Sequence, residues 1–266
     1  MTTGYADFDS SPIIVTVRGR RRFYLIGKRL FDLVVSLALI VVLSPLFAII
    51  AIWIKLDSAG PAIFRQTRAG QDHRSKERRR HRPSQASDSG ERRARPDRRA
   101  TNLGGKPFTF YKFRTMYVDA DPEIHRRFMR SLIQSHPQSP QDATQPSEIP
   151  YKINRDPRVT RVGRILRKTS LDELPQLFNV LIGEMSLVGP RPPILYELEN
   201  YHDWHKVRLK VLPGMTGLWQ VQGRSFVPFD EMVRLDLYYI EHMSFWLDLK
   251  ILLLTPMAVI GGKGAT

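Results

Sequence analysis

The residues best suited to chemistry in this 266-residue chain are two adjacent acids, Asp172 and Glu173. Ser170 precedes Glu173 by three residues, which is the spacing of a capping box at the start of a helix. We therefore predict a helix that begins after Ser170 and stops at Gly183. A helix N-terminus keeps a nearby carboxylate ionised, as a nucleophilic aspartate requires. The alternative is that both acids only complement the helix dipole.

Basic residues flank these acids on both sides. Arg167 and Lys168 precede them, and the segment 189–193 follows with Arg191 at its centre. Arginine binds phosphate oxygens through paired hydrogen bonds, and adjacent carboxylates offer oxygen ligands to Mg²⁺. This is the equipment of phosphoryl transfer, which depends on positioning and charge neutralisation.

The overall charge points to an anionic partner. The chain has 41 Lys and Arg against 26 Asp and Glu, and its formal net charge is +15. Nucleic acid, an acidic membrane surface and phosphorylated substrates all fit such a balance. The absence of cysteine excludes disulfides, thiolate catalysis and cysteine metal sites. The sequence also contains no Walker P-loop and no G-x-G-x-x-G fingerprint.

A run of 22 uncharged residues, 33–54, predicts a membrane segment because a bilayer core needs about 20 apolar residues. Ser44-Pro45 lies in its middle, where proline removes a backbone hydrogen bond and a serine hydroxyl can bind the freed carbonyl. Basic residues follow the run as well as precede it, so neither flank looks translocated. We predict a re-entrant helix-break-helix over 28–56, with a kinked spanning helix as the alternative.

The rest of the chain is predicted to form a basic tail at 1–27 and a cytosolic catalytic domain at 57–266. An arginine-rich insert at 71–105 has too few apolar residues to fold and is predicted to be disordered. The fold class is α+β: a small, mostly helical domain on the membrane surface with amphipathic helices at the interface. The ordered segments expected are a strand at 107–113, helices at 116–130 and 229–239, a loop at 135–150 and an interfacial C-terminal helix from 245.

Five motifs together resemble the bacterial sugar transferase family. They are KRLFD, FRQTRAG, YKFRTM, DPRVTRVGRILRKTSLDELPQLFNVLIGEMSLVGPRP and LPGMTGLWQVQGR. These proteins are monotopic polyprenyl-phosphate phosphoglycosyl transferases. The resemblance runs from Lys28 to the C-terminus except for the insert, which is longer than the short turn usual in the family. The resemblance is to the minimal members of the family, which lack a multi-spanning N-terminal domain.

The resemblance implies a two-step reaction with a covalent intermediate. Asp172 would attack the sugar-linked phosphate of a UDP-sugar and expel UMP, and undecaprenyl phosphate would then take the phosphosugar. Glu173 would support metal binding and proton handling, and Mg²⁺ would bind Asp172. Arg167, Arg191 and Arg114 are implied as phosphate-binding residues, and Arg224 as a contact of the nucleotide. The membrane helix would break at Ser44-Pro45.

The same resemblance implies a place and partners. The catalytic domain would lie on the cytosolic face of the bacterial inner membrane, in contact with lipid, and catalyse the first membrane step of exopolysaccharide, capsule or O-antigen synthesis. No nucleic acid is expected as a partner, and a homodimer is left open. Two alternatives stay open: a basic membrane-associated or nucleic-acid-binding protein without catalysis, and an adaptor that has lost the chemistry. No motif identifies the sugar.

Overall fold

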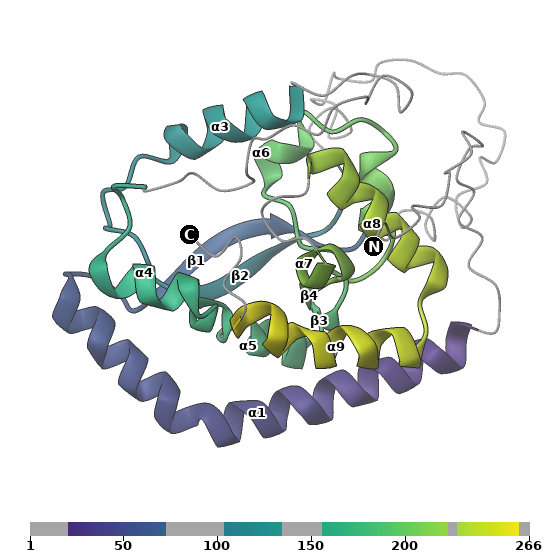
Figure 1. Ribbon diagram of the computed structural model, residues 1–266, viewed down its shortest axis with the longest axis horizontal. Coiled ribbons are helices and arrows are strands. Elements are labelled where there is room, and N and C mark those ends of the chain that lie inside the picture. Colours follow the sequence, from purple (N-terminus) through teal and green to yellow (C-terminus); the bar gives the residue numbers. More distant parts are fainter. Residues whose placement is uncertain (1–20, 73–103, 135–155, 223–227, 261–266) are drawn as a thin grey trace, which may run out of the picture.

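The computed structural model of the chain describes residues 21–72, 104–134, 156–222 and 228–260. Figure 1 shows one long helix, α1, beneath a domain made mostly of helices with two small sheets. The α+β, mostly helical class is thereby confirmed. The elements are α1 (Arg21–Asp57), β1 (Ile63–Ala69), β2 (Pro107–Phe113), α3 (Pro122–Gln134), α4 (Arg161–Lys168), η2 (Leu171–Glu173), α5 (Gln176–Ile182), β3 (Ser186–Val188), α6 (Leu195–Leu198), η3 (His205–Lys210), β4 (Gly214–Thr216), α7 (Leu218–Gln222), α8 (Phe229–His242) and α9 (Phe245–Ile260).

The predicted break in the membrane segment is instead a bend within one continuous helix. Pro45 lies inside α1, which changes direction near its middle in Figure 1. Pro45 has no N–H to donate to the carbonyl of Val41, and the Ser44 hydroxyl donates to that oxygen at 2.8 Å. The serine therefore satisfies the carbonyl that proline frees, as predicted. Because that carbonyl is satisfied, the helix bends and does not separate into two.

One face of α1 packs against the domain and the other is exposed and apolar. The most apolar stretch of this helix has a mean hydropathy of 2.9, and only 11% of it is buried. By length and composition α1 is the one helix among the described residues that could cross a membrane. A core helix of a soluble protein would be mostly buried, so that reading does not fit. The large exposed side chains include Leu33, Val34, Val41, Val42, Ile49, Ile52, Trp53 and Leu56.

Both ends of α1 are attached to the same domain. Near its start, Lys28 Nζ lies 2.7 Å from Asp248 Oδ2 of α9 in a buried ion pair. Near its end, Asp57 accepts a hydrogen bond from the backbone N–H of Val162 in α4 at 3.2 Å. Ile54 is also buried there, in a cluster with residues of α4 and β2. The helix thus lies along the underside of the domain and does not project away from it.

The predicted strand at 107–113 is confirmed as β2, which pairs with β1 in an antiparallel hairpin. The insert lies at the end of this hairpin. Gly70 N–H donates to Lys106 O at 2.9 Å, so the two ends of the insert meet. Asp72 N–H donates to the carbonyl of Leu209, which ties this base to η3. Residues 73–103 lie outside the described residues.

The helix predicted from Ser170 to Gly183 is wrong in its first half. Ser170 has a left-handed backbone (φ 54°) and its side chain caps nothing, so the expected capping box does not form. Pro175 explains the difference, because it cannot donate the i→i−4 hydrogen bond to Leu171. Residues Leu171–Glu173 form the 3₁₀ turn η2, and α5 starts only at Gln176. The predicted stop at Gly183 is confirmed by its left-handed φ of 90°.

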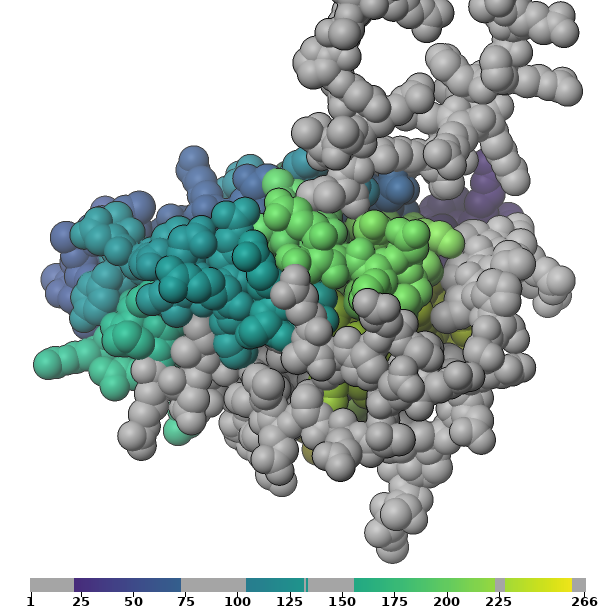
Figure 2. All heavy atoms as spheres, turned by 90° about the horizontal axis from the view of Figure 1, so that it is seen from above, coloured from purple at the N-terminus to yellow at the C-terminus, as the bar shows by residue number. Residues whose placement is uncertain are grey.

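The helix expected from Met116 begins later, at Pro122, as α3. Proline is favoured at the first helical position, and Asp121 Oδ1 accepts the N–H of Glu123 at 2.8 Å. Figure 2 shows that atoms of this region (teal) lie against the segment that contains α6 (green). The loop predicted at 135–150 lies outside the described residues.

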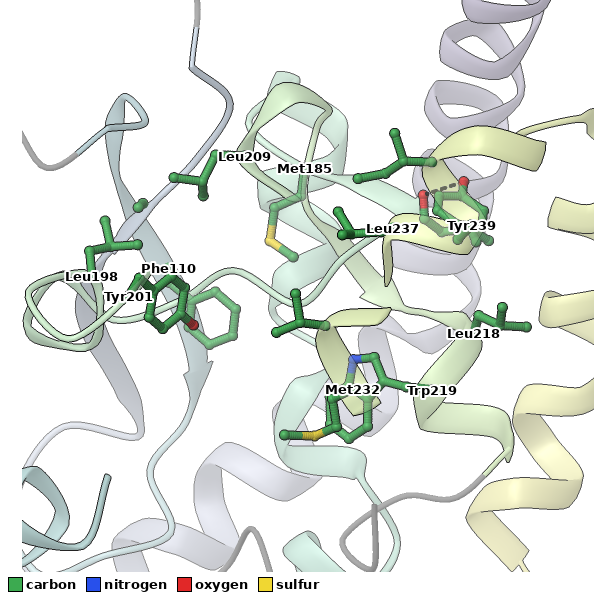
Figure 3. Close-up of a cluster of buried hydrophobic side chains, with 14 of the residues drawn as sticks. Phe110, Met185, Leu198, Tyr201, Leu209, Leu218, Trp219, Met232, Leu237 and Tyr239 are labelled. Atoms are coloured by element: carbon green, nitrogen blue, oxygen red, sulfur yellow. Dashed lines mark hydrogen bonds between the residues drawn. The ribbon is translucent and has the colours of Figure 1, made fainter. Parts of the chain in front are cut away.

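The core lies between α8, α9 and the β3–β4 pair. The helix predicted at 229–239 is confirmed as α8, and the C-terminal helix as α9. Figure 3 shows Met185, Leu237 and Tyr239 packed on one side of this core and Trp219 against Met232 on another. Trp219 is 6% exposed, in keeping with a packing role. This core fixes the strands from which the next segment, 189–193, extends.

Candidate active site

Asp172 lies in η2, the turn that joins α4 to α5, and its residue is only 7% exposed. The turn packs against β2, as the adjacent ribbons in Figure 1 indicate. Glu173 N–H donates to Ser170 O, and Leu174 N–H donates to Leu171 O, so the short turn has its own backbone hydrogen bonds. A carboxylate buried in this way needs positive neighbours to stay charged.

Lys112 of β2 supplies one of these positive charges. Its side chain is partly buried and interacts electrostatically with Asp172 and with the guanidinium groups of Arg167, Arg68 and Arg191. Burial lowers the pKa of Lys112 to about 8, against the opposing attraction of Asp172. We did not predict this residue from the sequence. The alternation of side chains along the strand could have indicated it, because Lys112 lies on the same face as two buried phenylalanines and a lysine on a buried face is unusual.

Arg167 is the second positive neighbour of Asp172, at the C-terminal end of α4. Its Nε–H donates to Thr115 Oγ1 at 3.0 Å. The helix can approach this segment because residue 163 is glycine: a Cβ there would lie 2.1 Å from the carbonyl oxygen of Thr115. Burial lowers the pKa of the Arg167 guanidinium and Asp172 opposes that shift. Arginine nevertheless stays charged at neutral pH.

Glu173 points to the other predicted arginine. Its Oε1 lies 2.9 Å from Arg191 Nη1, and both side chains are about one quarter exposed. Arg191 extends from β3 through the segment 189–193, which is held by close backbone contact. A Cβ on Gly214 would lie 2.0 Å from the backbone nitrogen of Gly189, so neither strand end tolerates a larger residue.

Arg68 of β1 joins the same group and was also missed. It is 7% exposed, its Nη1 donates to Pro192 O at 2.6 Å, and its guanidinium lies 4.5 Å from the ring centroid of Phe110. The antiparallel register brings Arg68 opposite Phe108 and so beside the strand that carries Lys112. The FRQTRAG motif contained this residue, but only the register brings it to the site.

The predicted residue Arg114 has its hydrogen-bond partners elsewhere. Arg114 is buried, and its guanidinium donates to Pro61 O, Ser58 O and Ser58 Oγ at 2.7–2.8 Å. It secures the turn between α1 and β1. Arg224 lies outside the described residues. Of the six predicted residues, the structure therefore brings Asp172, Glu173, Arg167 and Arg191 together.

The donor set fits Mg²⁺ only with help from a phosphate ligand. Within the described parts of the chain, no three His, Asp or Glu side chains are grouped as a closed metal site. Asp172 and Glu173 are adjacent, and Glu173 is held by Arg191. Magnesium in phosphoryl-transfer sites is commonly held by one or two carboxylates together with phosphate oxygens and water. Asp172, with Glu173 beside it, fits such a site.

The chain matches a known protein family. The profile described as "Bacterial sugar transferase" matches residues 23–105 and 96–262. The two segments meet in the arginine-rich insert, and together they cover nearly all of the chain.

Among similar proteins, the undecaprenyl-phosphate galactose phosphotransferase of Salmonella typhimurium is 39% identical over 90% of this chain and 41% of its own length. The UDP-glucose:undecaprenyl-phosphate glucose-1-phosphate transferase of Klebsiella pneumoniae is 35% identical over 91% of this chain and 42% of its own. The exopolysaccharide production protein ExoY of Sinorhizobium fredii is 34% identical, covering 90% and 88%. The chain thus spans less than half the length of the first two relatives and most of the third.

Lys112 gives a testable pH dependence of diphosphate binding. Its ammonium group is positive below a pKa of about 8 and neutral above it. We expect the dissociation constant for UDP, measured by calorimetry in detergent, to rise about tenfold between pH 7 and pH 9.5 as one charge is lost. Lys112→Arg keeps its charge over this range and should flatten the profile relative to wild type. Identical profiles for both proteins would remove Lys112 from the binding site.

Proposed function

We infer, because the chain belongs to the bacterial sugar transferase family, that it transfers a sugar 1-phosphate from a UDP-sugar to undecaprenyl phosphate. The products are undecaprenyl diphosphate-sugar and UMP. The observation that carries this proposal is the buried Asp172 carboxylate beside Lys112 and Arg167, with the Glu173–Arg191 pair next to it. A nucleophile for phosphorus and cations for a diphosphate lie together there.

In the first step, a carboxylate oxygen of Asp172 attacks the β-phosphorus, which bears the sugar. The bond from that phosphorus to the bridging oxygen breaks, and UMP leaves with the electron pair. The enzyme then holds the phosphosugar as an acyl phosphate. In the second step, a phosphate oxygen of the lipid attacks the same phosphorus, and the Asp172 carboxylate is released. Each step exchanges one P–O bond for another, so no oxidant or reductant is required.

The positive groups have distinct tasks in this scheme. Lys112 and Arg167 lie beside Asp172 and neutralise the phosphoryl oxygens that approach it. Arg68, near the end of β1, and Arg191, in the segment after β3, bind the phosphate that becomes UMP. Glu173 keeps Arg191 in place before the substrate arrives. Mg²⁺ held by Asp172 and phosphate oxygens would supply further charge neutralisation when bound.

We place the reaction on the cytosolic face of the inner membrane, with α1 re-entrant. Both ends of α1 are fixed to one domain, which supports the same-face topology over a true span. The exposed apolar side chains of α1 would enter the lipid, and exposed Trp246 and Leu253 of α9 would lie at its surface. The polyprenyl chain could then stay in the bilayer while its phosphate reaches Asp172.

The names of the relatives support a role in exopolysaccharide synthesis and differ in the sugar, since one is named for galactose and another for glucose. We propose that this chain catalyses the first membrane step of such a pathway. Asp172 and the basic group around it favour catalysis over a non-catalytic membrane or nucleic-acid-binding protein, because a binding surface has no need of a buried carboxylate.

Replacing the nucleophile tests the proposal most simply. Asp172→Asn keeps the size of the side chain but removes its charge, and we expect UMP release to fall by about three orders of magnitude or more. Purified protein would be assayed with UDP-glucose, UDP-galactose and their N-acetylated forms plus undecaprenyl phosphate. Asp203→Asn, at an acid whose side chain is 99% exposed and which lies in none of the site's elements, is the control and should behave as wild type. Near-normal turnover by Asp172→Asn would exclude it as the nucleophile.

Metal dependence follows from the paired carboxylates. EDTA is expected to stop transfer and added Mg²⁺ to restore it, because a divalent cation held by Asp172 would supply charge neutralisation beyond that of Lys112 and the arginines. The measurement is UMP release before and after titration with MgCl₂. Full activity in EDTA would show that the cationic side chains suffice.

The topology is testable because the chain has no native cysteine. Phe23→Cys and Leu56→Cys place thiols at exposed positions near the two ends of α1, which are 85% and 81% exposed. A membrane-impermeant maleimide should label both in inside-out vesicles and neither in intact spheroplasts. Val42→Cys, at an exposed apolar position between them, should react only after detergent is added. Labelling of the two ends from opposite sides would establish a spanning helix.

A further inference from the structure

The outer side of α4 carries a strip of positive charge that the proposed reaction does not use. Arg161, Arg164 and Lys168 are exposed, and their spacing of three and four residues places them on one face of the helix. We call these three residues the α4 cationic face. Val162 and Leu166, on the opposite side of the helix, are buried. The helix is therefore amphipathic, and the core accounts only for its inner side.

The buried arginines near this face have partners within the domain. Arg158, which precedes α4, forms an ion pair with Asp156 at 2.7 Å, and Arg167 donates to Thr115 Oγ1 at 3.0 Å. Among the residues that the structure describes, no side-chain hydrogen bond or ion pair holds the cations of the α4 cationic face. Three positive charges within two turns of helix repel one another, so an anionic partner would stabilise this face.

The position of α4 indicates where that partner lies. Val162 and Leu166 pack in one cluster with Ile50 and Ile54 of α1, and Asp57 accepts the N–H of Val162 at 3.2 Å. Figure 1 shows α4 beside the last part of α1, at one edge of the molecule. With the apolar side chains of α1 in the lipid as proposed, the end of this helix leaves the lipid next to α4. The α4 cationic face then lies at the depth of the phospholipid headgroups.

The neighbouring side chains suit the same environment. Ile165 lies between the cations of this face and is 47% exposed, and Lys55 is exposed near the end of α1. Exposed apolar side chains among arginines and lysines are typical of a helix at a membrane surface, where the apolar group enters the boundary of the acyl chains. The long stems of the cations let their charged ends reach the phosphate groups. Charge and position therefore favour lipid headgroups as the partner.

We propose that the α4 cationic face binds the headgroups of anionic phospholipids and so gathers acidic lipid beside the end of α1. The partner is the bulk acidic lipid of the membrane, not a substrate of the reaction. This inference rests on the membrane placement of α1 in the proposed function, and it does not depend on the chemistry at Asp172.

Energy transfer to labelled lipids tests the proposal. Leu56→Cys, at an exposed position one residue before Asp57, would carry a donor dye in an otherwise cysteine-free chain. The protein would be reconstituted in phosphatidylcholine vesicles with a trace of phosphatidylglycerol or phosphatidylcholine, each with the same acyl-chain acceptor. We expect transfer that corresponds to about threefold enrichment of phosphatidylglycerol near the dye. High salt should abolish this excess, because exposed charges are screened.

Two paired substitutions assign the enrichment to α4. Arg161→Gln with Arg164→Gln should remove the excess transfer to phosphatidylglycerol. Arg127→Gln with Arg130→Gln is the matched control, because these exposed arginines have the same spacing on α3, which lies on the side of the domain away from α1 in Figure 1. This control should retain the excess. Arg161→Lys with Arg164→Lys keeps both charges and should retain it as well, whatever the stability of the glutamine variant.

Several results would overturn the proposal. They are equal transfer to both lipids by the otherwise unchanged protein, an undiminished excess in the glutamine variant on α4, and loss of the excess in the lysine variant. Undecaprenyl phosphate added in an amount equal to the labelled lipid should leave the excess in place. Its disappearance would assign the α4 cationic face to the acceptor lipid and would likewise contradict a role in binding bulk lipid.

Failure of this inference is distinguishable from failure of the proposed function. The transfer measurement requires no turnover, so a protein that releases no UMP could still gather phosphatidylglycerol. Conversely, normal UMP release without lipid enrichment would contradict only the role of α4.

Discussion

The arrangement of the site depends on the electrostatic balance around one buried carboxylate. Asp172 lies in a short turn with 7% of its residue exposed, and Lys112 and Arg167 offset the cost of removing its charge from water. Asp172 in turn stabilises the charged form of Lys112, because its carboxylate opposes the fall in the pKa of that lysine. The three groups come from a strand, a helix and a turn that are distant in sequence. The strand, the helix and the turn must therefore pack together before the positive side chains can stabilise the charged form of Asp172.

The long helix α1 is part of that packing. Arg29 donates to the carbonyls of Val180 and Leu181 in α5, at 2.6 and 2.8 Å, and so binds the free end of the helix that follows the Asp172 turn. Asp32 accepts the N–H of Leu187 in β3, two residues before the segment with Arg191. The KRLFD motif thus fixes both sides of the site to α1, which is also the element suited to lipid. In the proposed membrane-bound state, this helix would hold the site at a fixed distance from the bilayer surface.

Local signals in the sequence predicted the parts of this structure that depend on local physics. The apolar run at 33–54 predicted the membrane segment within α1, and the alternation of side chains at 107–113 predicted β2. The helical spacing of apolar residues after Phe229 predicted α8. The prediction failed where two local signals conflict: the capping spacing of Ser170 and Glu173 indicated a helix, but Pro175 cannot donate to Leu171. Because Pro175 interrupts the helix, the turn that carries Asp172 is a short 3₁₀ turn. Similarly, Ser44 satisfies the carbonyl that Pro45 frees, and the helix bends where a break was predicted.

The cationic side of the site could be predicted only in part. Arg167 and Arg191 belong to the long motif around Asp172, which the family resemblance singles out. Lys112 and Arg68 come to the site through the register of β1 with β2, which no local pattern encodes. Arg114 shows the converse, since it belongs to a family motif and yet binds the turn after α1. A motif identifies residues that matter, and only the fold shows what each one contacts.

The most direct test of this account is mass spectrometry of the enzyme mixed with a UDP-sugar in the absence of the lipid acceptor. The account predicts a mass increase of one phosphosugar on the peptide that contains Asp172, which disappears when undecaprenyl phosphate is added. A stable adduct on another residue, or rapid turnover with the lipid and no adduct at any time, would contradict it.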